Sequence, residues 1–234
     1  MMDIQHLTPE ALAAIFDHTL LSSGASLSEL EQLCAEARQY GFGMVAINSA
    51  PVAFCHEQLK GTPVHVGAAI SFPLGQTTLD VKMFETDKAI CDGADEIDYV
   101  TNLTNVKEGN WNAVENEMTR ITQMCREAGV ISKVIFENCY LTKEEIRRLA
   151  QIAREVGPDF IKTSTGFGTS GAKAEDVRLM KQTVGDRVRV KAAGGIRSWE
   201  SCREMLEAGA ERIGTSSSIR ILNEFIMWRD KNDL

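Results

Sequence analysis

Two lysines occupy similar places in this sequence of 234 residues. Lys162 ends an apolar run in "DFIKTSTGFG", Lys191 ends another in "RVRVKAAGG", and small residues follow each lysine at once. Partial burial and a second ammonium group nearby both lower the pKa of a lysine. A lysine that is neutral at physiological pH is a nucleophile toward carbonyl carbons. The pair therefore predicts Schiff-base chemistry, with Lys162 as the nucleophile.

Further charged residues are expected beside this pair. Because successive side chains of a strand point to opposite faces, alternation within four strand-like runs places one set of charges on the inner side of a closed sheet. That set is Glu96, Asp98, Lys133, Glu137, Lys162, Arg189 and Lys191. A network of both signs is tolerated in such a place, whereas isolated charges are not. Two interpretations stay open: a structural network of ion pairs, or a catalytic site in which Asp98 is the acid or base, directly or through a water.

Strand-like and amphipathic helix-like runs alternate along the chain. We expect eight strands, over residues 16–21, 43–48, 64–70, 95–100, 132–137, 159–164, 187–193 and 211–216. The endings "DGADEIDYV", "EVGPDFIKT" and "EAGAERIGT" are similar, which indicates a repeated helix–turn–strand unit. The pattern predicts an α/β fold, a single-domain (β/α)8 TIM barrel over residues 1–234. A short N-terminal helix is expected at about 8–16 and a C-terminal tail at about 226–234.

The competing fold is an open doubly wound sheet, since alternation of strands and helices alone does not separate the two. The glycine-rich turn that usually follows the first strand of that fold has the pattern G-x-G-x-x-G. The corresponding stretch here, "FDHTLLSSGAS", does not contain it. The barrel is therefore favoured.

The segments after the last two expected strands are rich in glycine and serine. "AAGGIRS" covers 192–198 and "GTSSS" covers 214–218. In a (β/α)8 barrel these loops and the helix that follows commonly form a phosphate cradle. Backbone N–H groups of Gly194 and Gly195, with hydroxyls of Ser216 and Ser217, are expected to bind an oxyanion without a cation. The plainer alternatives are a tight turn and an ordinary helix N-cap.

Composition excludes several classes of function. The formal net charge is -8, which argues against a nucleic-acid or anionic-membrane surface, and no apolar run approaches the ~20 residues of a membrane span. The N-terminus lacks a basic region ahead of its apolar part, so no signal peptide is expected. The six cysteines are scattered, which is typical of reduced thiols in a cytoplasmic protein, and the four histidines lack metal-site spacing. We expect no metal and no cofactor.

Several motifs together resemble the deoxyribose-phosphate aldolase family. They are "FDHTLL", "FPLGQTTLDVKMFE", "ADEIDYV", "FIKTSTGF", "VKAAGGIR" and "GTSSS", and the match runs in order from about residue 12 to 225. The resemblance implies a class I aldolase on a (β/α)8 barrel that needs no metal. Such enzymes interconvert 2-deoxy-D-ribose 5-phosphate with D-glyceraldehyde 3-phosphate and acetaldehyde.

The resemblance also implies roles for individual residues. Lys162 matches the Schiff-base lysine, Lys191 the second lysine that lowers its pKa, and Asp98 the acidic residue of the proton relay. Asp17 matches an aspartate that helps orient the substrate. The remaining substrate-binding positions, most of them in the phosphate loops, are Thr165, Gly166, Gly194, Gly195, Ser216 and Ser217.

Two other functions stay open. One is a sister Schiff-base aldolase that acts on another phosphorylated sugar with a different donor. The other is a non-catalytic barrel that binds sugar phosphates and uses its lysines as structural ion pairs. The expected partners are a small phosphorylated sugar and acetaldehyde, with no nucleic acid and no membrane. A homodimer is expected only because symmetric dimers are the commonest soluble oligomers.

Four positions depart from the family pattern: Ala46 where cysteine is frequent, Ser49 where proline is frequent, Ser71 where glycine is common, and Asn138 where threonine is usual. They leave the expected chemical positions intact and bear on substrate preference.

The alanine at position 46 leads to the first prediction. Because it removes a thiol from the expected site region, the protein should resist inactivation by reactive aldehydes better than an Ala46→Cys variant. Activity followed over time in high acetaldehyde should decay faster in the variant. Equal decay of the two proteins would contradict this.

Overall fold

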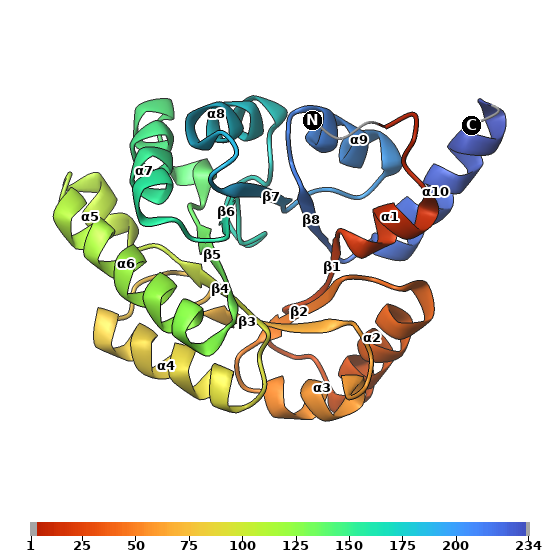
Figure 1. The fold of residues 1–234 in the computed structure, drawn as a ribbon, viewed down its shortest axis with the longest axis horizontal. Coiled ribbons are helices and arrows are strands. Elements are labelled where there is room, and N and C mark those ends of the chain that lie inside the picture. The colour runs from red at the N-terminus through yellow and green to blue at the C-terminus, as the bar shows by residue number, and fades with distance from the viewer. Residues whose placement is uncertain (1–3, 233–234) are drawn as a thin grey trace.

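Eight parallel strands form a closed barrel in the computed structural model, which describes residues 4–232. Each strand pairs with the next along the chain, and the last pairs with the first (Figure 1). The strands are β1 (Phe16–Leu20), β2 (Met44–Asn48), β3 (His65–Ile70), β4 (Glu96–Val100), β5 (Ile131–Ile135), β6 (Phe160–Lys162), β7 (Arg189–Ala193) and β8 (Arg212–Thr215). All eight coincide with expected strands, so the predicted barrel is confirmed and the open sheet is wrong.

Helices surround the barrel on its outside (Figure 1). They are α1 (Pro9–Ala14), α2 (Leu27–Tyr40), α3 (Val52–Leu59), α4 (Leu79–Cys91), α5 (Leu103–Lys107), α6 (Trp111–Ala128), α7 (Lys143–Val156), α8 (Ala174–Val184), α9 (Trp199–Glu207) and α10 (Ser218–Lys231), with a 3-10 turn, η1, at Asn138–Tyr140. Residues 226–231, expected in a tail, continue α10, and residues 233–234 of that tail lie outside the described residues. Within residues 4–232, no helix combines the length and apolar character needed to cross a membrane.

Local sequence signals set where several helices begin and end. Capping boxes start α2, α7 and α9, so the side chain of the N-cap residue accepts a hydrogen bond from a backbone N–H that has no partner inside the helix. Gly41, Gly129 and Gly157 end α2, α6 and α7 in the left-handed conformation, which glycine adopts without steric cost. These stops return the chain to the next strand over a few residues.

The two faces of the strands differ in chemistry. Side chains such as Ile97, Ile161 and Val190 belong to the apolar core between barrel and helices and are fully buried. Their strand neighbours Asp98, Lys162 and Lys191 are buried as well, on the opposite face and therefore in the barrel interior. The fold thus places a charged interior inside an apolar layer.

The backbone of Gly43, just before β2, lies against the chain that leads into β1. A Cβ atom added there would lie 2.2 Å from the carbonyl oxygen of Ala14. Gly43→Ala should lower the free energy of unfolding by about 1–3 kcal/mol, because backbone cannot yield as a flexible side chain can.

Urea denaturation followed by circular dichroism would measure this change. Gly24→Ala is the matched control, since a Cβ there meets nothing within 4 Å, and it should change stability by less than about 1 kcal/mol. Equal effects of the two substitutions would contradict the prediction.

Candidate active site

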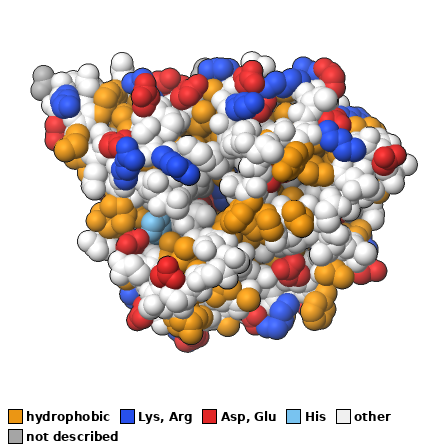
Figure 2. All heavy atoms as spheres, turned by 180° about the vertical axis from the view of Figure 1, so that it is seen from behind, with side chains coloured by type: hydrophobic (Ala, Val, Ile, Leu, Met, Phe, Trp, Pro, Cys, Tyr) orange, Lys and Arg blue, Asp and Glu red, His pale blue; other side chains and the backbone are white. Residues whose placement is uncertain are grey.

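A cavity of about 440 Å³ opens at the carboxyl ends of the strands. The segments that follow β1, β6, β7 and β8 line it, over 19–23, 165–167, 193–197 and 214–216, and the two lysines Lys162 and Lys191 contribute to its wall. Figure 2 shows the molecule hollowed near the middle of one face, with hydrophobic side chains beside the hollow. The volume suits a small organic ligand.

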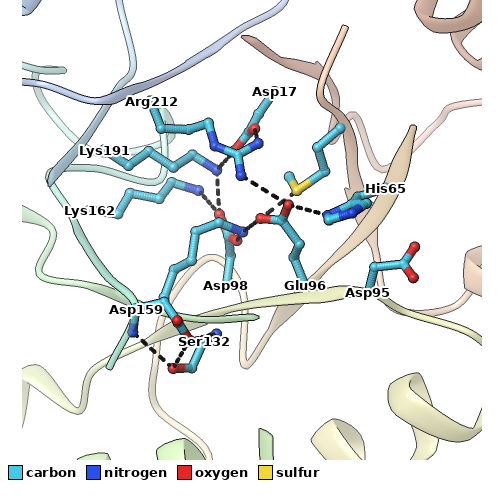
Figure 3. A network of polar contacts seen from close by, with 12 residues as sticks. Asp17, His65, Asp95, Glu96, Asp98, Ser132, Asp159, Lys162, Lys191 and Arg212 are labelled. Atoms are coloured by element: carbon cyan, nitrogen blue, oxygen red, sulfur yellow. Dashed lines mark hydrogen bonds and ion pairs between the residues drawn. The ribbon is translucent and has the colours of Figure 1, made fainter. Parts of the chain in front are cut away.

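Lys162 and Lys191 share one carboxylate oxygen. They are register partners at the ends of β6 and β7. Asp98 Oδ2, on β4, lies 2.9 Å from Lys162 Nζ and 2.6 Å from Lys191 Nζ, and Figure 3 shows both side chains reaching toward it. The structure therefore brings together the three residues for which catalytic roles are predicted.

The charged cluster continues through the barrel interior below this trio (Figure 3). Lys133 Nζ on β5 lies 2.5 Å from Asp98 Oδ1 and 2.5 Å from Glu96 Oε2. The guanidinium of Arg212 bridges Glu96 at 3.0 Å and Asp17 at 2.9 Å. Asp17 also forms an ion pair with Lys191.

The environment of Lys162 lowers its pKa to about 8. Burial is the largest cause, since it disfavours the charged form. Asp98 acts in the opposite direction, while Lys191 and Lys133 add to the lowering. Both causes named from the sequence, burial and a second ammonium group, therefore lower the pKa of Lys162, and burial is the larger.

Two neighbours of Lys162 are held in their charged forms. Burial alone would raise the pKa of Asp98, but Lys133, Lys162 and Lys191 hold it well below its usual value. Burial would likewise lower the pKa of Lys133, but Asp98 and Glu96 raise it. Lys162 differs from Lys133 because its own pKa is lowered, to about 8.

The expected phosphate loops border the same cavity. Gly166, Gly194, Gly195 and Ser216 line it, as does Thr165. The three glycines have φ of +92°, +85° and +77°, where other residues are strained. All three positions therefore favour glycine for conformation, and Gly194 also for space, because a Cβ there would lie 3.1 Å from the Gly171 Cα atom.

Two expectations about the cradle need correction. Ser217 is the N-cap of α10, its N–H donates to Thr215 Oγ1 at 2.9 Å, and it is not among the described residues that line the cavity. The cradle was expected to lack a cation, but Arg197 belongs to the lining. Arg197 follows the glycine pair by two residues in the sequence, and this position would have indicated that it belongs to the same loop.

Asp17 is fully buried and contacts Lys191 and Arg212. Asp17 is not among the described residues that line the cavity, whereas its partner Lys191 is. Asp17 can therefore act on a ligand in the cavity only through Lys191. Asp98 has the same relation to the cavity. The role that the family resemblance implies for Asp17, to help orient the substrate, therefore stays a prediction.

Two members of the expected interior set lie elsewhere. Arg189 stands at the amino end of β7, where its side chain is 47% exposed and its guanidinium lies 4.0 Å from the centre of the Phe160 ring. Glu137 lies beyond the end of β5 and accepts hydrogen bonds from Thr165. Alternation fails for Glu137 because this residue lies beyond regular strand, whereas Arg189 begins β7 and its side chain reaches solvent at the amino end of the strand.

Two residues of the cluster were missed from the sequence. Arg212 lies two residues before Gly214 in "ERIGTS", so the same alternation applied to β8 would have placed it inside. His65 Nδ1 lies 2.7 Å from Glu96 Oε1, and its half-exposed side chain ends the cluster at the amino side of β3. The hydrogen bond to Glu96 raises the pKa of His65, although burial acts against it.

Two of the four departures from the family pattern share a partner. Ser49 Oγ donates to Glu85 Oε1 at 2.7 Å, and the N–H of Ser71 donates to Glu85 Oε2 at 2.8 Å. Ser71 has φ of +51°, a conformation that favours glycine. Ala46 lies buried on β2 beside Thr19, and the N–H of Asn138 donates to Thr163 O at 2.9 Å.

Similarity to known proteins accords with this geometry. The model of the DeoC/LacD family aldolases matches residues 11–222. The chain belongs to that family. Among its relatives are the deoxyribose-phosphate aldolases of Lactobacillus acidophilus, 55% identical over 92% of this chain and 90% of the relative, and of Bacteroides thetaiotaomicron, 50% identical over 95% and 93%. The solved structure of the deoxyribose phosphate aldolase from Aeropyrum pernix, described as tetrameric, is also similar. Its TM-score is 0.88, at 33% identity over 94% of this chain and 93% of its own.

Among residues 4–232, no group of three or more His, Cys, Asp and Glu side chains is arranged to hold a metal ion. The six cysteines are free. The amine of Lys162 is the nucleophile that this cavity offers.

The lowered pKa of Lys162 can be measured directly. An amine is neutral above its pKa, so acylation of Lys162 by brief pulses of acetic anhydride should reach half of its plateau near pH 8. Mass spectrometry of peptides would follow the label, with Lys60 as internal reference because its side chain is 71% exposed. Labelling that rises only near pH ~10.4, as for an ordinary lysine, would contradict the prediction.

Proposed function

We propose that this member of the family is a class I aldolase that reversibly cleaves 2-deoxy-D-ribose 5-phosphate to D-glyceraldehyde 3-phosphate and acetaldehyde, with Lys162 as the Schiff-base residue. The observation that carries the proposal is an amine with a pKa of about 8 in the wall of the cavity. The names of the relatives support the substrate.

Cleavage begins when the neutral amine of Lys162 attacks C1 of the open-chain aldehyde. Loss of water gives an iminium ion, which accepts electrons from the carbon chain. Removal of the proton from the C3 hydroxyl then breaks the C2–C3 bond and releases D-glyceraldehyde 3-phosphate. The remaining enamine takes up a proton at its terminal carbon, and hydrolysis of the iminium releases acetaldehyde and restores Lys162.

Lys191 and Asp98 handle protons in this scheme. Lys191 Nζ borders the cavity and lies 2.6 Å from Asp98 Oδ2, so it passes protons between the carboxylate and a substrate or a water. Asp98 acts through Lys191 and Lys162 rather than by direct contact. Asp17 forms an ion pair with Lys191, so it acts as a residue that positions the Lys191 side chain.

The phosphate binds where the loops border the cavity. Gly166, Gly194, Gly195, Arg197 and Ser216 belong to the lining, so we expect the backbone N–H groups of the glycines, the hydroxyl of Ser216 and the cation of Arg197 to hold it. A phosphate there would leave the aldehyde end of the sugar near Lys162. Ser217 contributes through the N-terminus of α10, where the helix dipole favours an anion.

A cytoplasmic location and a homodimer also stay predictions. The tetramer described for the Aeropyrum pernix relative supports a symmetric oligomer as the more general expectation.

Borohydride trapping tests the proposed role of Lys162. Incubation with deoxyribose 5-phosphate and borohydride should reduce an adduct onto Lys162, located by mass spectrometry, and Lys162→Ala should abolish it. Because the covalent step is lost, kcat should fall in that variant by at least about 10³-fold.

Lys60→Ala is the matched control, since Lys60 is an exposed lysine on another part of the chain. An adduct on a different lysine, or none in the parent protein, would reject the assignment. Turnover with pyruvate or dihydroxyacetone, but not with acetaldehyde, would identify a sister aldolase instead.

A further inference from the structure

Glu137 adopts the left-handed backbone conformation, which is unusual for a residue other than glycine. It directly follows Phe136 beyond the end of β5, with φ of +51° and ψ of +59°. Only Ser71 shares a positive φ among the described residues other than glycine. Such a conformation is unfavourable and persists where surrounding contacts impose it, often at functional sites. Its side chain is buried, with 3% of the residue exposed.

The carboxylate of Glu137 is aimed at one residue of the cavity wall. The N–H of Thr165 donates to Oε1 at 3.1 Å, and the hydroxyl of Thr165 contacts Oε2. Gly168 packs closely against the same carboxylate, because a Cβ there would lie 3.2 Å from the Glu137 Cδ atom. Glu137 therefore holds both the backbone and the hydroxyl of Thr165.

These contacts fix the direction of the Thr165 hydroxyl. A carboxylate only accepts hydrogen bonds, so the single hydroxyl proton of Thr165 is committed to Glu137. The N–H of Phe167 donates to Thr165 Oγ1 at 3.0 Å and occupies one of its two lone pairs. The remaining lone pair can serve only as an acceptor toward a ligand in the cavity.

We propose that Glu137 is a specificity-determining, positioning residue that makes Thr165 an obligate acceptor for a substrate hydroxyl. The inference rests on the proposed function. Thr165 lies in the cavity wall together with Lys162 and Gly166, and it directly precedes Gly166 in the sequence. In the proposed function, Lys162 carries the Schiff base and Gly166 helps to bind the phosphate. The hydroxyl that Thr165 accepts from is the one next to the aldehyde carbon of the phosphorylated fragment, which does not take part in bond cleavage.

The synthesis direction isolates this contact. With acetaldehyde as donor, kcat/KM is measured for D-glyceraldehyde 3-phosphate and for 3-oxopropyl phosphate, which lacks only that hydroxyl. The parent protein should prefer the hydroxylated acceptor by at least about tenfold, because a site built to pair a hydroxyl is left unpaired by the analogue. Thr165→Val should reduce this ratio toward one, and Thr165→Ser should retain most of it.

The decisive variant is Glu137→Gln. Its amide keeps the shape of the carboxylate but can donate to Thr165 Oγ1, which would occupy the free lone pair and release the hydroxyl proton. The ratio of the two kcat/KM values should then fall at least about fivefold, since Thr165 no longer accepts from the substrate. Glu155→Gln, an exposed position on α7, is the control and should leave the ratio as in the parent.

A purely structural role of Glu137 predicts a different result. It would lower kcat/KM for both acceptors equally, and an unchanged ratio in Glu137→Gln would overturn the proposal. Borohydride trapping of acetaldehyde on Lys162 is run on every variant, since this adduct forms without the phosphorylated acceptor. An adduct with an unchanged ratio rejects the role of Glu137 alone, whereas no adduct in the parent rejects the proposed function and this inference with it.

Discussion

The charged interior of the barrel depends on one carboxylate that forms ion pairs with three ammonium groups. Asp98 contacts Lys133 with one oxygen and Lys162 and Lys191 with the other, all in the barrel interior. Without it, Lys162 would lose its ion-pair partner, and a buried charge without a partner is strongly destabilising. The closed barrel makes this arrangement possible, because β4, β5, β6 and β7 are neighbours and point alternate side chains to one interior.

Lys162 has few ion-pair partners, and this accompanies the burial that lowers its pKa. Lys133 contacts Glu96 and Asp98, and Lys191 contacts Asp17 and Asp98, whereas the ion pair shown for Lys162 is with Asp98. Within this cluster Lys162 therefore has fewer carboxylates to stabilise its charged form, which accords with its lowered pKa.

The sequence predicted the barrel, its eight strands and the trio of Lys162, Lys191 and Asp98, because strand alternation is a local property with a period of two. It failed where a side chain lies outside regular strand geometry. Glu137 follows β5 in a left-handed conformation that alternation does not describe, and Arg189 lies at the amino end of β7, next to solvent. Contacts between distant segments, such as Arg212 with Glu96, require the three-dimensional closure of the sheet.

Two of the four departures from the family pattern lie in loops and not among the charged residues of the barrel interior. Charged residues inside the barrel are coupled through shared carboxylates, so a change in one would unbalance several others. Ser49 and Ser71 lie in loops instead, where a single residue of α4, Glu85, accepts a hydrogen bond from each. A departure there alters a local contact and leaves the charge balance below intact. We therefore expect differences in substrate preference within the family to arise in the loops, and the nucleophile to stay with the barrel interior.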